Sequence, residues 1–468
     1  MSAVKFFPTF SRALKTNAIH VNRAGNFMLI PDGMETKDLI RLDPRDLLSN
    51  GMAYEYAGDA YFLAHEYNLK SRSYISSELN YFIIIPTLRC NLSCTYCQVS
   101  RADENARGFD WNEEQYDQFL DFFNKHAGIE PKIEIQGGEP TLIFSKLKTF
   151  LQKLYLVRPK TQVVICTNLQ HLPEGFFEDV QKLDLQISSS LDGNFDIHNA
   201  NRNQNQKSSE IFFQNVGLCL EKLGKERLSF LTTISNFDDI IDALEAYRKL
   251  GLDDVYLRPV NYQGFARKRH SQSKENAEDW FEKYIAALDL MFQSNDNEDH
   301  KIRETNFALH AKRIFSNSFN SHVDFRNPNP IAKDYVVINF DGTFFPSDEA
   351  RMLHRIGLID LSIGSLDSGF DYDKIVELDQ HAQLENYADC NACAYKPFCG
   401  IDIIDLISKN GTVDIKMSET EHCKAHIKMF DYIFSKLADR DETFLRNLNF
   451  NITGSYSIPH FVAGRVYD

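Results

Sequence analysis

Between residues 81 and 266, short apolar strands alternate with amphipathic helices, and this alternation limits the possible folds more than any other feature. Strand-like composition marks six segments, at residues 81–87, 132–136, 161–166, 184–190, 229–234 and 254–258. Helical periodicity occupies the intervals between them, for example at residues 112–124, 144–156, 209–223 and 237–250. Strands joined by helical crossovers pair in parallel, so the pattern predicts an α/β fold around a six-stranded parallel sheet.

Three cysteines follow the first of these strands, with the spacing C-x3-C-x2-C at Cys90, Cys94 and Cys97. Disulfides are disfavoured because nine cysteines is an odd number and no signal peptide is recognised, and we expect a cytosolic protein. Three clustered thiolates indicate a metal site, and they are one fewer than the four that normally hold a four-iron cluster. Such a cluster keeps one iron open for a small molecule. The alternative is zinc, whose structural sites are closed by four ligands.

The motif C-x3-C-x-aromatic-C resembles the signature of the radical S-adenosylmethionine (SAM) enzymes. Two later segments resemble the same family. Residues 136–140 are similar to its GGEP motif, and residues 188–193, followed by His198 and Arg202, are similar to its SLDG-H-R segment. The resemblance covers about residues 81–265 and implies an open, TIM-like partial (β/α)6 barrel.

The resemblance also implies a role for each motif, and the motifs follow strands at the carboxyl end, where parallel sheets bind ligands. Cys90, Cys94 and Cys97 would hold a [4Fe-4S] cluster whose fourth iron SAM chelates. One electron from an external donor, such as a flavodoxin or ferredoxin, would cleave SAM to a 5′-deoxyadenosyl radical. The expected SAM contacts are Tyr96 at the adenine, Gly137 and Gly138 at the methionyl group, Glu139 at the ammonium, Asn168 at the ribose, and Ser190 with Arg202 at the carboxylate. The alternatives are structural: a buried aromatic, a strand-to-helix turn and loop residues.

A second cysteine group lies near the C-terminus, at Cys390, Cys393, Cys399 and Cys423. It resembles the auxiliary-cluster (SPASM or twitch-like) domain that follows many radical SAM barrels and holds two further clusters. Ser347 and Ile403 occupy two of that family's cysteine positions. We therefore expect one auxiliary [4Fe-4S] cluster, held by the four remaining cysteines. A closed zinc site is the alternative, because four thiolates suit zinc equally well.

Asp348 directly follows Ser347 and matches the aspartate that deprotonates the substrate in the related sulfatase maturases. It is a candidate general base, with a solvated or structural carboxylate as the alternative. Cys166 and Cys219 fall on a predicted strand and a predicted helix. We interpret both as small buried apolar residues.

The sequence predicts four regions. They are an N-terminal α+β domain at 1–80, a barrel with linker helices at 81–316, an auxiliary-cluster domain at 317–440, and a tail at 441–468. The first contains a hairpin at residues 18–30 and a helix from 35 to 42. It resembles the leader-peptide recognition element of peptide-modifying enzymes, which adds the peptide to a sheet edge. A cap on the barrel is the alternative.

The net charge of −15 argues against nonspecific binding to nucleic acid or to an anionic membrane surface. The apolar run 81–85 is too short to span a bilayer. Five stretches resemble the His-Xaa-Ser system radical SAM maturases, at residues 87–91, 97–101, 135–140, 262–266 and 347–352.

This second resemblance implies a ribosomally made precursor peptide as substrate, crosslinked from an aromatic ring carbon to a β-carbon in a cyclophane. Thioether formation, epimerisation and formylglycine formation remain open. So do a radical SAM enzyme for RNA or a small metabolite, and a noncatalytic iron–sulfur or zinc protein.

Overall fold

The computed structural model describes residues 4–34, 44–56, 58–59, 78–203, 205–316 and 326–459. Its largest element is a ten-stranded sheet with the order β14-β12-β11-β10-β9-β6-β16-β17-β18-β19. The first six strands of this order are parallel, which confirms the predicted partial barrel. Their bounds are Leu79–Thr87 (β6), Ala127–Gly137 (β9), Gln162–Cys166 (β10), Gln186–Ser190 (β11), Leu228–Ile234 (β12) and Leu257–Pro259 (β14).

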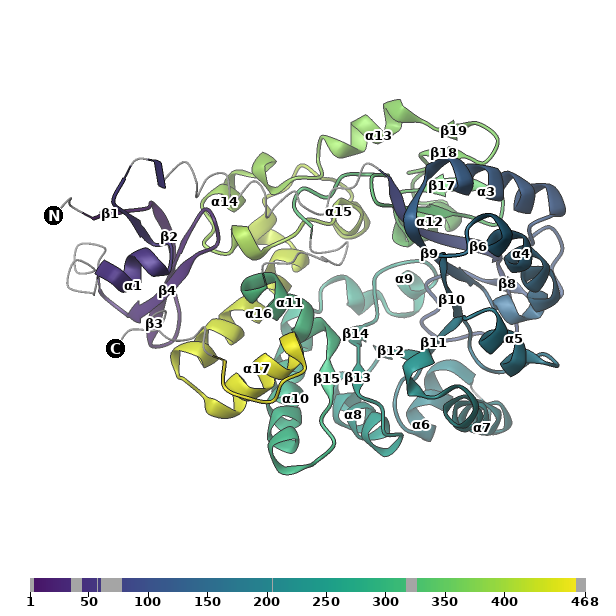
Figure 1. The fold of residues 1–468 in the computed structure, drawn as a ribbon, viewed down its shortest axis with the longest axis horizontal. Helices are drawn as coiled ribbons and strands as arrows, with labels where there is room; N and C mark the ends of the chain where they lie inside the picture. The colour runs from purple at the N-terminus through teal and green to yellow at the C-terminus, as the bar shows by residue number, and fades with distance from the viewer. Residues whose placement is uncertain are drawn as a thin grey trace.

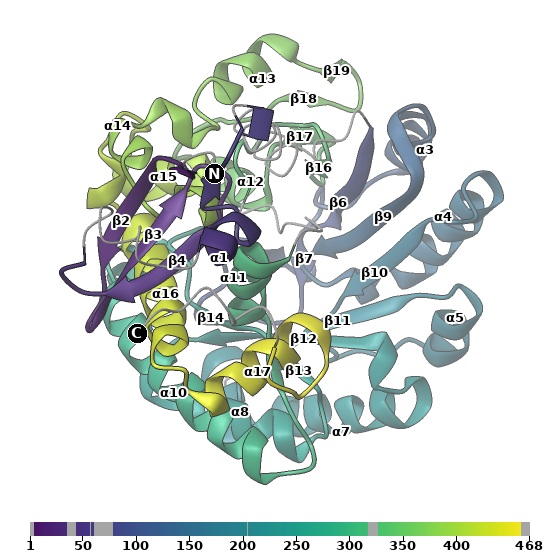
Figure 2. The same ribbon diagram turned by 60° about the vertical axis from the view of Figure 1, so that its left-hand side comes forward.

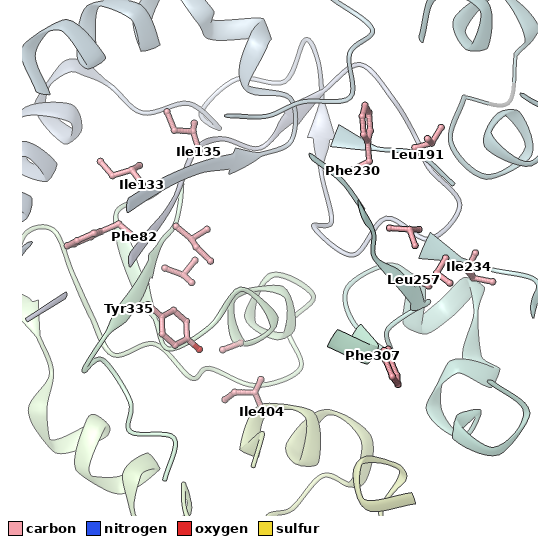
Figure 3. Close-up of a cluster of buried hydrophobic side chains, with 14 of the residues drawn as sticks. Phe82, Ile133, Ile135, Leu191, Phe230, Ile234, Leu257, Phe307, Tyr335 and Ile404 are labelled. Atoms are coloured by element: carbon pink, nitrogen blue, oxygen red, sulfur yellow. The ribbon is translucent and has the colours of Figure 1, made fainter. Parts of the chain in front are cut away.

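Amphipathic helices cover the outer face of the strand arc (Figures 1 and 2). They are α3 (Glu113–His126), α4 (Phe144–Val157), α5 (Phe176–Lys182), α7 (Gln206–Leu223) and α8 (Ile240–Lys249). Helix α3 begins with a capping box, in which the side chains of Asn112 and Gln115 each accept a hydrogen bond from the other residue's main chain. Figure 3 shows Phe82, Ile133 and Ile135 pointing from β6 and β9 toward this helical layer. Because side chains alternate along a strand, the residues between them face the lumen of the arc.

The sixth predicted strand, 254–258, is divided into two. Asp254–Val255 (β13) pairs with Arg303–Glu304 (β15), whereas β14 pairs with β12. The buried Glu304 carboxylate accepts a hydrogen bond from the Leu257 main chain at 3.1 Å, which fixes the start of β14. A long-range polar contact therefore breaks a strand that its local composition predicts as continuous.

Beyond β6, the sheet continues with strands from the C-terminal third of the chain. Tyr335–Ile338 (β16) runs parallel to β6, and Thr343–Phe345 (β17), Gly364–Ser365 (β18) and Gly369–Phe370 (β19) follow in antiparallel order. Strands β16 and β17 thus form a hairpin. Its place beside the first barrel strand brings residues 347–352 toward the lumen.

The C-terminal helices pack on helices that precede residue 317. Helices α10 (Ala277–Asn297) and α11 (Thr305–Phe315) pack against α16 (Glu421–Ala438) and α17 (Glu442–Thr453). The predicted tail therefore contains a docked helix, anchored by Arg446 to Asp296 at 2.9 Å and by Asn295 to Asn447 at 2.8 Å. None of the helices in the described ranges is long and apolar enough to cross a membrane.

The N-terminal region forms a three-stranded antiparallel sheet, and it confirms the predicted hairpin. Its strands are Thr9–Ala13 (β2), Asn17–Asn22 (β3) and Phe27–Pro31 (β4). Arg12 binds Asp431 through two hydrogen bonds of 2.6 and 2.7 Å, and the Phe27 ring lies 5.0 Å from that of Phe434. These contacts are with α16 and not with the barrel. The helix predicted at 35–42 lies outside the described residues.

Candidate functional site

One cavity of about 760 Å³ lies at the carboxyl ends of the barrel strands. It is lined by nearly all the residues that the sequence predicts for the cluster, SAM and catalysis. These are Cys90, Cys94, Cys97, Tyr96, Gly137, Gly138, Asn168, Ser190, Arg202 and Asp348. Residues as far apart as Cys90 and Arg202 thus meet because parallel strands end at one edge of the sheet. Asp348 instead follows the antiparallel strand β17 and reaches the cavity from the hairpin beside β6.

The three cysteines lie on the loop that follows β6. The loop is fixed at its start by Arg89, which binds the Asp110 carboxylate at 2.8 and 2.7 Å. Burial raises the pKa of Cys90 to about 12 and also raises the pKa of Cys94. Both are therefore neutral thiols until a metal replaces their protons.

Gly137 and Gly138 lie where β9 crosses close to the chain that leaves β6. A Cβ on Gly137 would lie 1.9 Å from the Thr87 carbonyl oxygen, and one on Gly138 would lie 2.3 Å from that of Arg89. Gly137 also has a φ of +149°. The packing of the main chain therefore requires both glycines, in addition to any role at a ligand.

Glu139 is fully buried. Unlike the other residues predicted to contact SAM, it does not line the cavity. Its carboxylate accepts hydrogen bonds from the Thr141 main chain at 3.0 Å, the Thr141 hydroxyl at 2.7 Å and the Asn168 main chain at 2.7 Å. Burial raises its pKa. In this arrangement Glu139 links the ends of β9 and β10, and its predicted contact with a SAM ammonium stays a prediction.

Asn168 lies beside the first cysteine. Its amide nitrogen donates to the Asn91 side chain at 2.8 Å and lies 3.8 Å from the Cys90 sulfur. Asn168 thus orients the cysteine loop and borders the cavity. Ser190 borders the same cavity from the end of β11.

Tyr96 and Arg202 belong to a buried polar network. The Tyr96 hydroxyl donates to the Asp192 carboxylate and accepts from Arg202 at 2.8 Å. Burial raises the pKa values of Tyr96 and Asp192, and the negative groups around Arg202 keep its guanidinium charged. The SLDG-H-R segment is therefore held to the cysteine loop by these bonds. His198 stacks on Phe212 at 3.9 Å and serves the packing of that segment.

Asp348 begins helix α12 (Asp348–Arg355), and Ser347 caps this helix by accepting from the Ala350 main chain at 3.2 Å. The Asp348 carboxylate accepts from the Arg351 guanidinium at 2.7 Å, and Arg351 is only 1 % exposed. A charge-assisted bond to a buried side chain fixes the direction of the carboxylate. Asp348 thus presents an oriented carboxylate at the cavity.

Sequence reasoning missed a polar group deeper in the lumen. Glu134 accepts hydrogen bonds from the Tyr81 hydroxyl, from the Gln136 amide and, at 3.3 Å, from the Cys166 thiol. All four residues line the cavity. The alternation of polar residues 132, 134 and 136 with Ile133 and Ile135 was the available signal, because one face of this strand cannot be apolar.

The interpretation of Cys166 as a small apolar residue was therefore wrong. Its thiol ends β10, faces the cavity and donates to a carboxylate, and burial keeps its pKa well above the usual value. The interpretation of Cys219 is confirmed, since this residue of α7 is fully buried among apolar side chains.

The four C-terminal cysteines line a separate cavity of about 80 Å³. Cys390 lies in the short helix α14 (Ala388–Asn391), and the Thr420 hydroxyl accepts from the Cys423 main chain at 3.1 Å at the start of α16. Within the described ranges, no three His, Cys, Asp or Glu side chains converge closely enough to bind one metal ion. The four thiols border this space, and four thiolates can hold either a four-iron cluster or a zinc ion.

The positions of the two absent cysteines each lie at the start of a helix. Ser347 caps α12, and Ile403 is the buried first residue of α15 (Ile403–Asn410). Helices α12 and α15 pack against each other.

Comparison with known proteins supports this reading of the barrel. The sequence model of the Radical SAM superfamily matches residues 84–270. An uncharacterized protein of Methanocaldococcus jannaschii is 29 % identical over 118 residues, which are 25 % of this chain and 39 % of that protein. An uncharacterized protein of Methanothermobacter thermautotrophicus is 26 % identical over 161 residues, or 33 % and 57 %. The chain thus matches less than two thirds of either relative.

Solved structures share the fold over most of the chain. A histidine-tagged form of anSMEcpe with bound AdoMet (SAM) has a TM-score of 0.60 at 17 % identity, covering 80 % of this chain and 97 % of that one. Streptococcus suis SuiB bound to precursor peptide SuiA has a TM-score of 0.53 at 14 % identity, covering 90 % and 100 %. The superfamily match, the fold and the cysteine loop at its expected strand end identify residues 84–270 as a radical SAM domain.

Proposed function

We propose that this chain is a radical SAM enzyme that binds SAM and a [4Fe-4S] cluster. We further propose that it is a maturase, which installs a crosslink of the carbon–carbon cyclophane type in a ribosomally synthesised precursor peptide. The observation that carries the proposal is the single cavity that joins the cysteine loop to Asp348 and the lumen of the barrel. At about 760 Å³ it is large enough to hold SAM and a short stretch of peptide side chains together.

Two of the similar structures support a peptide as the substrate. SuiB was solved with the precursor peptide SuiA, and anSMEcpe was solved with AdoMet and the Cp18Cys peptide. The second of these has a TM-score of 0.54 at 17 % identity and covers 77 % of this chain. The His-Xaa-Ser maturase resemblance of the sequence adds the cyclophane as the favoured product.

The cysteine loop supplies the thiolates for the cluster, which with SAM provides a 5′-deoxyadenosyl radical when reduced by an external donor such as a flavodoxin or ferredoxin. The main chain at Gly137 and Gly138 allows close approach of the methionyl group. Ser190 and Arg202 border the place for its carboxylate. The Asp192 bond to Tyr96 keeps that ring in place beside the cysteines.

Asp348 is the proposed general base for the proton that the substrate loses. Its carboxylate borders the cavity, and the bond to Arg351 fixes its direction. A base held in one orientation avoids an ordering cost in each turnover.

We further propose one auxiliary [4Fe-4S] cluster, held by Cys390, Cys393, Cys399 and Cys423 around the smaller cavity. Two four-iron clusters contain roughly 8 irons per chain, whereas three contain roughly 12. Iron and sulfide analysis after anaerobic reconstitution distinguishes these values, and bound zinc in place of the second cluster contradicts the proposal.

Residues 1–80 remain a proposed leader-binding element. Strand β2 is one of the two outer strands of the described three-stranded sheet, so it offers an edge to which a peptide strand can pair.

The decisive experiment is coexpression with a short peptide encoded beside this protein, followed by mass spectrometry. A product lighter by two hydrogen atoms per event, with fragmentation blocked across an aromatic residue, is expected. An unchanged mass with an inverted residue indicates epimerisation and contradicts the crosslink. The Cys90→Ala variant is the control for modification by other enzymes of the host.

A further inference from the structure

The large cavity contains one cation that the described part of the protein does not neutralise. Its other arginine and lysine side chains each have a partner: Arg101 with Asp103 at 3.7 Å, Lys132 with Glu134 at 4.0 Å, Arg202 with the Tyr96 hydroxyl at 2.8 Å, and Arg326 with Asp334 at 2.6 Å. Arg258 also lines the cavity, yet among the described residues it has neither a hydrogen bond nor an ion pair. Its guanidinium lies over the Tyr256 ring, 5.3 Å from the centroid.

The fold holds Arg258 in this position. It is the central residue of β14, between the buried Leu257 and the half-buried Pro259, so its side chain takes the opposite face from Leu257 and enters the lumen. Arg258 pairs in register with Thr233, whereas Ser190 pairs with Leu231 two residues earlier on β12. In the register of β12, Arg258 therefore lies two residues beyond Ser190, toward the carboxyl edge of the sheet where the cysteine loop begins.

A guanidinium with no acceptor from the described residues has donors left for a ligand that brings an acceptor into the cavity. Its planar set of N–H donors matches the two oxygens of a carboxylate. The stacked Tyr256 ring covers one face of the guanidinium and leaves its edge for such an anion.

We propose that Arg258 is a further anion-recognition residue of this cavity, in addition to Ser190 and Arg202, and pairs with a carboxylate of the bound ligand. Two ligands of the proposed function carry this group. SAM has its methionyl carboxylate, and a precursor peptide has acidic side chains and a C-terminus. The peptide branch of the proposal rests on the proposed function, and the SAM branch does not.

The test compares Arg258→Gln, which removes the charge, with Arg258→Lys, which keeps the charge and loses the planar donor set. Arg303→Gln is the matched control, because Arg303 pairs with Asp254 outside the cavity. In the first arm, calorimetry on the reconstituted protein measures binding of SAM and of decarboxylated SAM. In the second arm, the apparent KM is measured for the coexpressed peptide and for its Asp→Asn and Glu→Gln variants.

If SAM supplies the carboxylate, Arg258→Gln weakens SAM binding by about 10- to 100-fold and leaves binding of decarboxylated SAM unchanged. If the peptide supplies the carboxylate, Arg258→Gln raises the peptide KM by a similar factor. One acid-to-amide change in the peptide then raises the KM of the wild-type enzyme equally. The same peptide change has no further effect on the KM of Arg258→Gln. Arg258→Lys, which also tests the site should Arg258→Gln not fold, gives a smaller loss in the same arm.

The proposal is overturned when Arg258→Gln leaves both SAM affinity and peptide KM within about twofold of the wild type. It is also overturned when no peptide is modified and SAM affinity does not depend on Arg258. Since the SAM arm needs no peptide, failure of the proposed function alone leaves that arm able to support or to reject the site.

Discussion

The two cysteine sites of this chain differ in openness. Three thiols border a cavity of about 760 Å³ together with charged and hydroxyl side chains, whereas four thiols surround about 80 Å³ between residues such as Tyr395, Met417 and Phe430. The first leaves room for a ligand at the metal, and the second leaves room for little more than a cluster. If both sites hold the proposed clusters, the open site suits bond-breaking chemistry on a ligand, whereas the closed site suits electron transfer.

Helix α11 connects the two regions. At its start, the Glu304 side chain accepts from the Phe307 main chain at 2.6 Å and from Leu257 of the barrel edge. At its other end, Arg313 donates to the main-chain oxygens of Phe398 and Cys399 at 3.0 and 2.9 Å. One helix therefore holds the last barrel strand and the loop of the C-terminal thiols at a fixed separation.

The largest expected effect comes from removing the open site. Substitution of Cys90, Cys94 and Cys97 by alanine should abolish SAM cleavage completely, because no thiolate remains to hold the cluster that binds SAM. The iron–sulfur absorption of the C-terminal site should remain, with roughly 4 irons per chain. A colourless, zinc-containing variant would contradict the contrast between the two sites.

Removal of the C-terminal cysteine site should separate SAM cleavage from formation of the peptide product. The Cys393→Ala/Cys399→Ala variant should lose formation of the peptide product and retain SAM cleavage, because only the second electron-transfer site is lost. Iron analysis and product mass spectrometry measure the two effects. Cys219→Ala, in a buried thiol of α7, is the control for loss of a cysteine side chain. Full product formation without the C-terminal cluster would show that the closed site has another role.

Within the open site, Asp348→Asn should lower peptide turnover by roughly 100-fold or more, the usual contribution of a positioned base. Glu349→Gln is the matched control, because Glu349 lines the same cavity from the next position of α12. Turnover per SAM cleaved is the appropriate measurement. Wild-type turnover in Asp348→Asn with normal cluster content rules out the base.

The smallest expected effect concerns Glu304, at the start of helix α11, which connects the two regions. Burial raises the pKa of Glu304 from 4.5 to about 7. The folded chain thus binds this proton more tightly than the unfolded chain. The stabilisation from the neutral form is complete below pH 4.5 and is lost as the pH rises to about 7, with a total of ~3 kcal/mol.

Glu304→Gln should therefore remove this part of the pH dependence between pH 4.5 and about 7, as measured by urea unfolding at several pH values. Glu282→Gln, at an exposed position of α10, should keep the wild-type profile. An unchanged pH dependence of the unfolding free energy in Glu304→Gln would contradict its assignment to the Glu304 proton.

Local patterns predicted most of the barrel. The apolar runs around Phe82 and Ile133, and the amphipathic helices between them, need only neighbouring residues to be recognised, so their order and bounds agree with the structure to within a few residues. The division of the sixth strand could not be predicted, because it depends on Glu304, a residue about 50 positions away. The docked helix α17 likewise depends on partners such as Asp296.

The candidate site shows the same division. The cysteine, glycine and SLDG motifs predicted which residues border the cavity, since strand ends in a parallel sheet share one edge. The pattern did not indicate that Glu139 is buried behind the cavity or that the Cys166 thiol enters it. Both outcomes depend on which face of a strand or turn the tertiary packing turns inward.

The candidate metal-binding groups could be recognised in the sequence alone: three cysteines at one strand end and four near the C-terminus. The parallel α/β barrel could be recognised in the same way, because spacing and periodicity encode these features locally. The packing of distant segments places the first group beside an open lumen, in which Arg258 has no partner among the described residues, and places the second around a small space. Volume and charge balance arise where distant segments meet, and no single segment carries that information.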